Sequence, residues 1–81
     1  MQIANMIETI NGDKIWYSNY LLHRINGPAI ELINGHKEWW VNGELHREDG
    51  PAMEYASGSK AWYINGIRLN DLKNIFLKCL K

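Results

Sequence analysis

The sequence predicts a mainly β fold, in which antiparallel β-hairpin repeats form an elongated twisted sheet and one C-terminal helix caps that sheet. Two observations predict the sheet: an internal repeat with a period of 23 residues, and glycines spaced seven or eight residues apart. A helical pattern after residue 70 predicts the cap. We expect the 81 residues to form a single domain, residues 1–81, in which a large active-site cavity would compete with the core.

The repeat is an internal duplication. Residues 7–29 align with residues 30–52 at a constant offset of 23, and 14 of the 23 pairs are identical. Residues 53–69 form a third copy, which keeps Trp62, Asn65 and Gly66 and then loses the His-Arg pair that both earlier copies contain. A period of this size indicates stacked supersecondary units, and the degraded last copy is typical of a terminal unit.

Within each unit, turn signals separate short strand-like segments. Asn34-Gly35, Asn42-Gly43 and Asn65-Gly66 predict type I′ hairpin turns, because Asn followed by Gly tolerates the positive φ at both central positions. The segments between the turns, such as HKEWWV and KAWYI, are rich in the aromatic and β-branched residues that favour strands. In the first unit Tyr20 replaces the turn glycine, so we expect that turn to be wider.

The final residues have a different pattern. Asn70 is a good N-cap, and we expect a helix over residues 71–80. Its apolar residues fall at spacings of three and four, which predicts one apolar face: Leu72, Ile75, Phe76, Cys79 and Leu80. This helix would cover an edge strand of the sheet that could otherwise pair with another chain.

The repeated pattern W-(W/Y)-x-N-G-x-L-H-R-x-x-G-P-A resembles the variant MORN (membrane occupation and recognition nexus) repeat, from residue 7 to about residue 69. MORN repeats are β-hairpin repeats found in many bacterial, phage and giant-virus proteins. The resemblance implies a scaffold for protein contacts, and for some members a binder of lipid headgroups.

One tetrapeptide, His-Arg-Glu-Asp at residues 46–49, contains residue types that act in acid/base catalysis. Such catalysis needs side chains that converge on one position, whereas neighbouring strand residues point to opposite faces. Only the His-Arg pair recurs, as His23-Arg24, where Ile25 and Asn26 replace the acidic residues. We therefore expect His46 and Arg47 to connect units, the guanidinium donating to turn carbonyls, and we predict no enzyme activity. A repeated ligand-binding site is the alternative.

Two columns of aromatic residues run through the repeat, at neighbouring positions that point to opposite faces. They are Trp16, Trp39 and Trp62 in one column, and Tyr17, Trp40 and Tyr63 in the other. In one interpretation the first column is core and the second, together with Glu38, is an exposed protein-binding row. In the other, both columns are buried.

Composition excludes several function classes. Nine basic and nine acidic residues, with no basic stripe, argue against nucleic-acid binding. The lone Cys79 belongs to no metal-binding spacing, so we expect no metal or cofactor and a reducing, cytoplasmic location. No apolar run approaches the roughly 20 residues that span a bilayer, and we do not expect a membrane partner.

The sequence thus favours a protein-binding module. The resemblance to the phage and viral repeat implies a small phage- or virus-encoded inhibitor of a host protein such as a CRISPR effector, which we expect to act in the host cytoplasm. One alternative is a self-assembling module that forms a homodimer through the edge of its first unit. Another is a binder of anionic lipid headgroups through Lys14, Lys37 and Lys60.

Overall fold

The computed structural model describes residues 4–69, in which all paired strands are antiparallel. The eleven strands of this part of the chain are β1 (Asn5–Glu8), β2 (Lys14–Ser18), β3 (Leu21–Leu22), β4 (Ile30–Glu31), β5 (Lys37–Glu38), β6 (Trp40–Val41), β7 (Glu44–Leu45), β8 (Met53–Glu54), β9 (Lys60–Ala61), β10 (Tyr63–Ile64) and β11 (Ile67–Arg68). The predicted helix at residues 71–80 lies outside the described residues.

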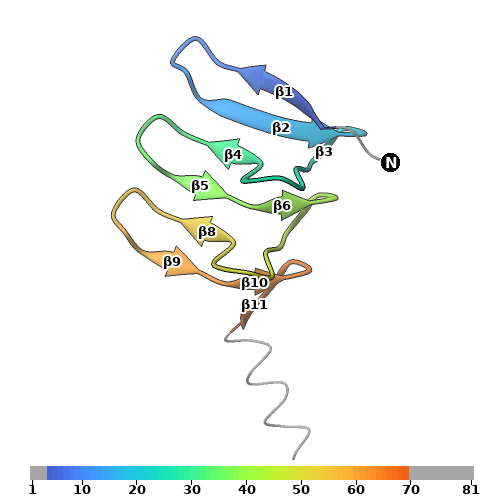
Figure 1. Cartoon of the computed structure of the whole chain (residues 1–81), viewed down its shortest axis with the longest axis vertical. Coiled ribbons are helices and arrows are strands. Elements are labelled where there is room, and N and C mark those ends of the chain that lie inside the picture. The colour runs from blue at the N-terminus through green and yellow to red at the C-terminus, as the bar shows by residue number, and fades with distance from the viewer. Residues whose placement is uncertain (1–3, 70–81) are drawn as a thin grey trace, which may run out of the picture.

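The main sheet is a meander with the strand order β1-β2-β4-β5-β8-β9. Its strands lie across the long axis of the molecule and follow one another down that axis, as Figure 1 shows. A short second hairpin leaves each unit at one side, formed by β2-β3, β6-β7 and β10-β11. The predicted mainly β fold of antiparallel hairpins is therefore confirmed.

Two kinds of turn alternate along the chain. Asn42-Gly43 and Asn65-Gly66 have positive φ at both residues, as the type I′ prediction requires. Asn34-Gly35 does not, because only Gly35 has positive φ. Its N–H donates to Leu32 O at 3.0 Å, which is a type I turn followed by a glycine bulge. The type I′ prediction for this turn is therefore wrong.

The turn at Tyr20 also differs from expectation. Asn19 and Tyr20 have φ of 52° and 65°, and Ser18 lies opposite Leu21, so the turn has two residues like its counterparts and is not wider. Tyr20 is fully exposed. In the second unit, by contrast, a Cβ on Gly43 would lie 3.1 Å from the Leu21 side chain of the preceding unit. The fully exposed Tyr20 side chain therefore has the space that a side chain at Gly43 would lack.

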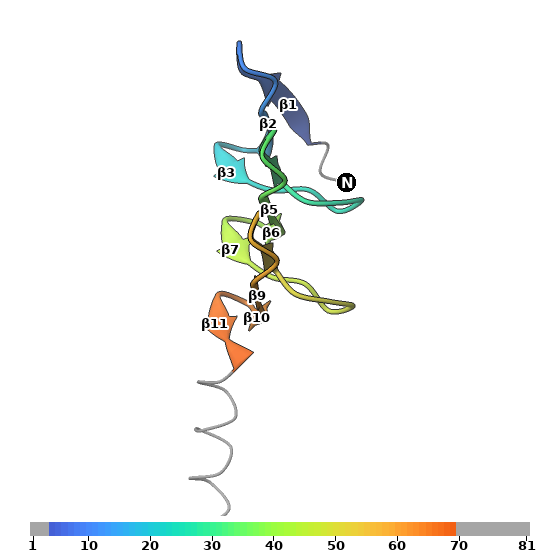
Figure 2. The same cartoon turned by 90° about the vertical axis from the view of Figure 1, so that its left-hand side faces the viewer.

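The sheet has little conventional core. Among residues 4–69 the buried apolar residues are Ala29, Ala52 and Ala61, and no large side chain is fully buried. The molecule measures 52 × 34 × 18 Å, and the described residues form one seven-stranded sheet and two separate two-stranded hairpins. Figure 2 shows this narrow profile, with the loops that precede β4 and β8 projecting to one side. Side-chain contacts between successive units must therefore provide much of the stability.

Candidate functional site

The strongest repeated contact is a Trp-Arg clamp, in which an arginine lies on a tryptophan ring and bonds to the next unit. In the first clamp, the Arg24 guanidinium carbon lies 3.7 Å from the Trp16 ring centre. Its Nη1 donates to Pro28 O at 3.1 Å and to the Glu31 carboxylate at 2.8 Å. Because Glu31 belongs to the second unit, the clamp joins two units.

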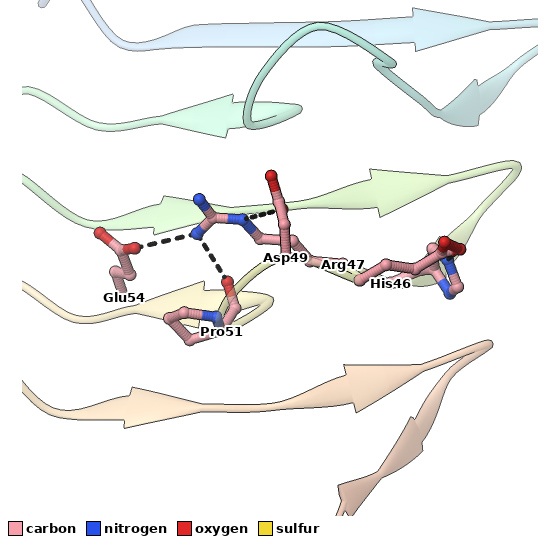
Figure 3. Close-up of polar contacts among 6 residues, drawn as sticks. His46, Arg47, Asp49, Pro51 and Glu54 are labelled. Carbon is pink, nitrogen blue, oxygen red and sulfur yellow. Dashed lines mark hydrogen bonds and ion pairs between the residues drawn. The ribbon is translucent and has the colours of Figure 1, made fainter.

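The second clamp repeats this geometry around Arg47. The guanidinium carbon lies 3.8 Å from the Trp39 ring centre, and Nη1 donates to Pro51 O and to Glu54, both at 3.0 Å. Figure 3 shows these bonds together with a third, from Arg47 Nε to Asp49 Oδ1 at 3.1 Å. The third unit has Asn70 at the equivalent position, and Trp62 is 45% exposed.

The clamps explain the glycine of each Gly-Pro pair. A Cβ on Gly27 would lie 3.1 Å from the Arg24 guanidinium carbon, and one on Gly50 would lie 2.9 Å from that of Arg47. Both distances are too short for a relaxed contact. The guanidinium fits between the tryptophan ring and the backbone only because the residue there carries no side chain. Close approach, and not a positive φ, is the reason for glycine here.

The histidines make a second connection between units. Asn42 N–H donates to His23 Nδ1 at 3.0 Å, and Asn65 N–H donates to His46 Nδ1 at 2.9 Å. Each histidine thus holds the Asn-Gly turn of the following unit. Because Nδ1 accepts a bond, the proton of the neutral ring is on Nε2.

The two histidines differ at Nε2. In His46 this atom lies 3.4 Å from the Glu48 carboxylate. In His23, which is only 2% exposed, Nε2 is buried and has no hydrogen-bond partner in the described part of the chain. Ile25 stands where the second copy has Glu48, so the first copy lacks the acceptor.

A groove of about 600 Å³ lies between the two projecting loops. Residues 24–28 form one wall, residues 46–49 form the other, and Trp39 and Val41 contribute to the lining. The exposed Ile25 lies on one side, and Glu48 and Asp49, 77% and 87% exposed, lie on the other. The two arginines of this groove are already bonded within the protein, so it offers an apolar side and an acidic side to a binding partner.

The two aromatic columns have similar burial. Tyr17, Trp40 and Tyr63 are half-buried. Trp16 and Trp39 are half-buried as well, and Trp62 is exposed. Neither column is therefore fully buried, and the second column keeps part of each ring exposed. A sheet of one layer has no second layer to enclose either face, and the clamps cover only part of each tryptophan ring.

Glu38 has a definite place beside the second column. Its Oε1 accepts from Trp40 Nε1 and its Oε2 accepts from His36 Nε2, both at 2.7 Å. The carboxylate is mostly buried. Glu38 thus fixes the orientation of the Trp40 ring, and both of its oxygens are in use.

Sequence reasoning missed a row of exposed apolar side chains at the tips of the turns. Ile10 is fully exposed, Ile33 is the equivalent residue of the second unit, and Tyr55 lies in the third turn. Turn positions usually carry polar residues, so isoleucine in TING and LING was the available signal.

The lysines lie opposite carboxylates. Lys14 lies between Glu8 and Glu31, and Lys37 lies between Glu31 and Glu54 in the strand register. Lys60 follows Glu54. We call this series of alternating charges the charge ladder. Because glutamates separate the lysines, they do not form a continuous basic surface.

Three general findings complete the description. Within residues 4–69, no group of three His, Cys, Asp or Glu side chains is arranged to hold a metal ion. No helix in that range has the length and apolar character to cross a bilayer. No family model matches the sequence, and no curated protein or solved structure is detectably similar to it.

Proposed function

We propose that this protein is a non-catalytic binding module of the variant MORN type, which uses its rigid sheet to present side chains to a partner protein. The main observation that supports this proposal is the column formed by Tyr17, Trp40 and Tyr63. It places one half-buried aromatic ring in each of three successive units. Half-burial leaves part of each ring available for contact, and aromatic rings provide large contact area with few rotatable bonds.

The middle ring of this column is already ordered. Trp40 donates to Glu38, and Glu38 also accepts from His36. Little side-chain entropy is lost when a partner contacts a ring that is held in this way, and a contact of this kind therefore favours binding. The role proposed for Glu38 is to position Trp40.

We propose further that the partner is a host protein, such as a bacterial CRISPR effector, which a phage- or virus-encoded inhibitor of this kind would block. The support is the resemblance of the repeat to those of phage and viral proteins. The contact would place the aromatic column over a functional surface of the effector.

The first test is affinity capture from a bacterial lysate with three immobilised forms of the full chain. These are the wild type, Tyr17→Ser/Tyr63→Ser, and the matched control Ile10→Ser/Ile33→Ser, which removes exposed apolar surface from the turn tips. Circular dichroism and urea unfolding establish that each variant is folded. We expect one protein to be retained by the wild type and the control, and lost from the column variant.

Two results would contradict the proposal. If no form retains a protein, the chain is not a binder of host proteins. If the turn-tip variant alone loses the partner, binding occurs at the tips. For the inhibitory role, the captured effector is purified and its nuclease activity is titrated with the wild type and the column variant. Only the wild type should inhibit.

A further inference from the structure

The two ends of the main sheet are complementary in charge. The charge ladder runs in strand order through Glu8, Lys14, Glu31, Lys37, Glu54 and Lys60. It therefore begins with a glutamate on β1 and ends with a lysine on β9. Both residues are exposed, and within residues 4–69 the outer edges of β1 and β9 pair with no strand.

The internal joints show how these two edges would fit. The first joint pairs β2 with β4, with Lys14 opposite Glu31 and Ile15 opposite Ile30. The second pairs β5 with β8 in the same register. In the 23-residue repeat, Lys60-Ala61 of β9 is equivalent to Lys14-Ile15, and Ile7-Glu8 of β1 is equivalent to Ile30-Glu31. The outer edges thus carry the two halves of a strand pairing that the protein already makes twice, although Leu69 and Asn70 replace the histidine and arginine that accompany it inside the protein.

We propose that copies of this chain associate head to tail. The outer edge of β9 in one copy pairs antiparallel with the outer edge of β1 in the next, with Lys60 opposite Glu8 and Ala61 opposite Ile7. The occupant of each edge is a second copy, and the joint continues both the sheet and the charge ladder. Because the two surfaces differ, the association is heterologous and builds rings or open rows of subunits.

The neighbouring position supports the same joint. Trp16 N–H donates to Ala29 O, and Trp39 N–H donates to Ala52 O, both at 2.7 Å. The equivalent pair across the proposed joint is Trp62 N–H and the Met6 carbonyl of the next copy.

Side-chain volume also fits this pairing. Trp62 lacks the arginine that covers the other two tryptophans, and Met6, 47% exposed, stands where the internal joints have a buried alanine. The larger Met6 side chain would occupy space beside the uncovered ring, and a methionine sulfur packs favourably against an aromatic ring.

Sedimentation velocity of the full chain over a wide concentration range tests the proposal with two charge reversals. Glu8→Lys places two lysines at the joint, and Lys60→Glu places two glutamates there. Each variant alone should associate roughly tenfold more weakly than the wild type, because like charges directly opposite each other on neighbouring strands destabilise the pair. An equimolar mixture of the two variants should regain wild-type association, because every mixed joint again pairs a lysine with a glutamate.

The matched controls are Glu44→Lys and Arg68→Glu, which change the net charge equally at exposed positions on β7 and β11. They should associate as the wild type does, and urea unfolding checks that all four variants fold. A wild type that stays monomeric at every concentration overturns the proposal. So does a Lys60→Glu variant that associates normally, since that result indicates pairing of β1 with β1, and so does a mixture that fails to recover.

Discussion

The two joints between units use the same clamp in different surroundings. At the second joint, Asp49 bonds to Arg47 and Glu48 lies close to His46. At the first, Asn26 and Ile25 occupy those positions, and His23 Nε2 has no partner in the described chain. Both joints nevertheless keep the stacking on tryptophan, the bond to the proline carbonyl and the bond to the next glutamate.

This comparison separates the contacts that make a joint from those that accompany it. The shared bonds come from partly buried groups, whereas Glu48 and Asp49 are largely exposed. Exposed ion pairs contribute little to the free energy of unfolding in water. The His-Arg-Glu-Asp sequence therefore combines a repeated structural pair with two surface acids.

The largest effect should come from removing either arginine. Arg24→Ala and Arg47→Ala should each lower the free energy of unfolding by about 2 kcal/mol, the sum of a cation-π contact and hydrogen bonds to a carbonyl and a carboxylate. Urea unfolding followed by tryptophan fluorescence measures both. Equal losses are expected, and a much larger loss for Arg47→Ala would mean that Asp49 matters to the joint.

A smaller loss of unfolding free energy is expected when a methyl group is added beside the guanidinium. Gly50→Ala should cost about 1 kcal/mol, because the added Cβ forces the guanidinium off the ring. The same substitution in an Arg47→Ala background should cost much less, and a double-mutant cycle of urea unfolding measures that difference. If the losses from Gly50→Ala and Arg47→Ala simply add, the glycine is not required by the close approach of the guanidinium.

The first and second two-residue turns give the next comparison. Gly43→Ala should destabilise by about 1 kcal/mol, because the residue has positive φ and its Cβ would touch Leu21. Tyr20→Gly should instead raise the midpoint of thermal unfolding slightly, since it relieves positive φ and removes no packing contact. A fall in that midpoint would mean that the Tyr20 ring stabilises the turn.

A substitution can supply the hydrogen-bond acceptor that His23 Nε2 lacks at the first joint. Ile25→Glu would place a carboxylate where His23 Nε2 needs an acceptor, and we expect a gain of about 0.5 kcal/mol in the free energy of unfolding. Ile25→Gln serves as the uncharged control, and its amide should give part of the gain. No change in either variant would mean that Nε2 already bonds to water.

The smallest effect is expected at Asp49. Asp49→Asn should change the free energy of unfolding by less than about 0.5 kcal/mol, because an exposed pair is screened by solvent. Urea unfolding at low and high salt measures the change, and a loss above 1 kcal/mol at low salt would show that Asp49 organises the clamp.

Much of this fold could be predicted from particular residues. The 23-residue offset located the units, and Asn42-Gly43 and Asn65-Gly66 located two turns with the correct backbone. Asn34-Gly35 was misassigned because the same dipeptide also fits a type I turn with a glycine bulge. At Tyr20 the missing glycine misled us, because a linear pattern does not show that the Tyr20 side chain is fully exposed whereas a Cβ on Gly43 would touch Leu21.

The site was harder to predict because its contacts cross between units. Nothing in a linear pattern states that Arg24 lies on Trp16 or that Glu38 holds Trp40. The partial exposure of both aromatic columns follows from a sheet of one layer, whereas from the sequence we expected at least one column to be core. The exposed Ile10 and Ile33 did leave a signal, as apolar residues in turns.

The short reach of the joints has an evolutionary consequence. Trp16, Arg24 and Glu31 lie within 16 consecutive residues, and the longest side-chain hydrogen bond between units, from Ile33 N–H to Asp13 Oδ1, spans 20 positions. Both spans are shorter than the 23-residue period. A tandem duplication of one period in the gene therefore copies every contact needed for one more joint. Such a protein can lengthen or shorten by whole units without any compensating substitution elsewhere.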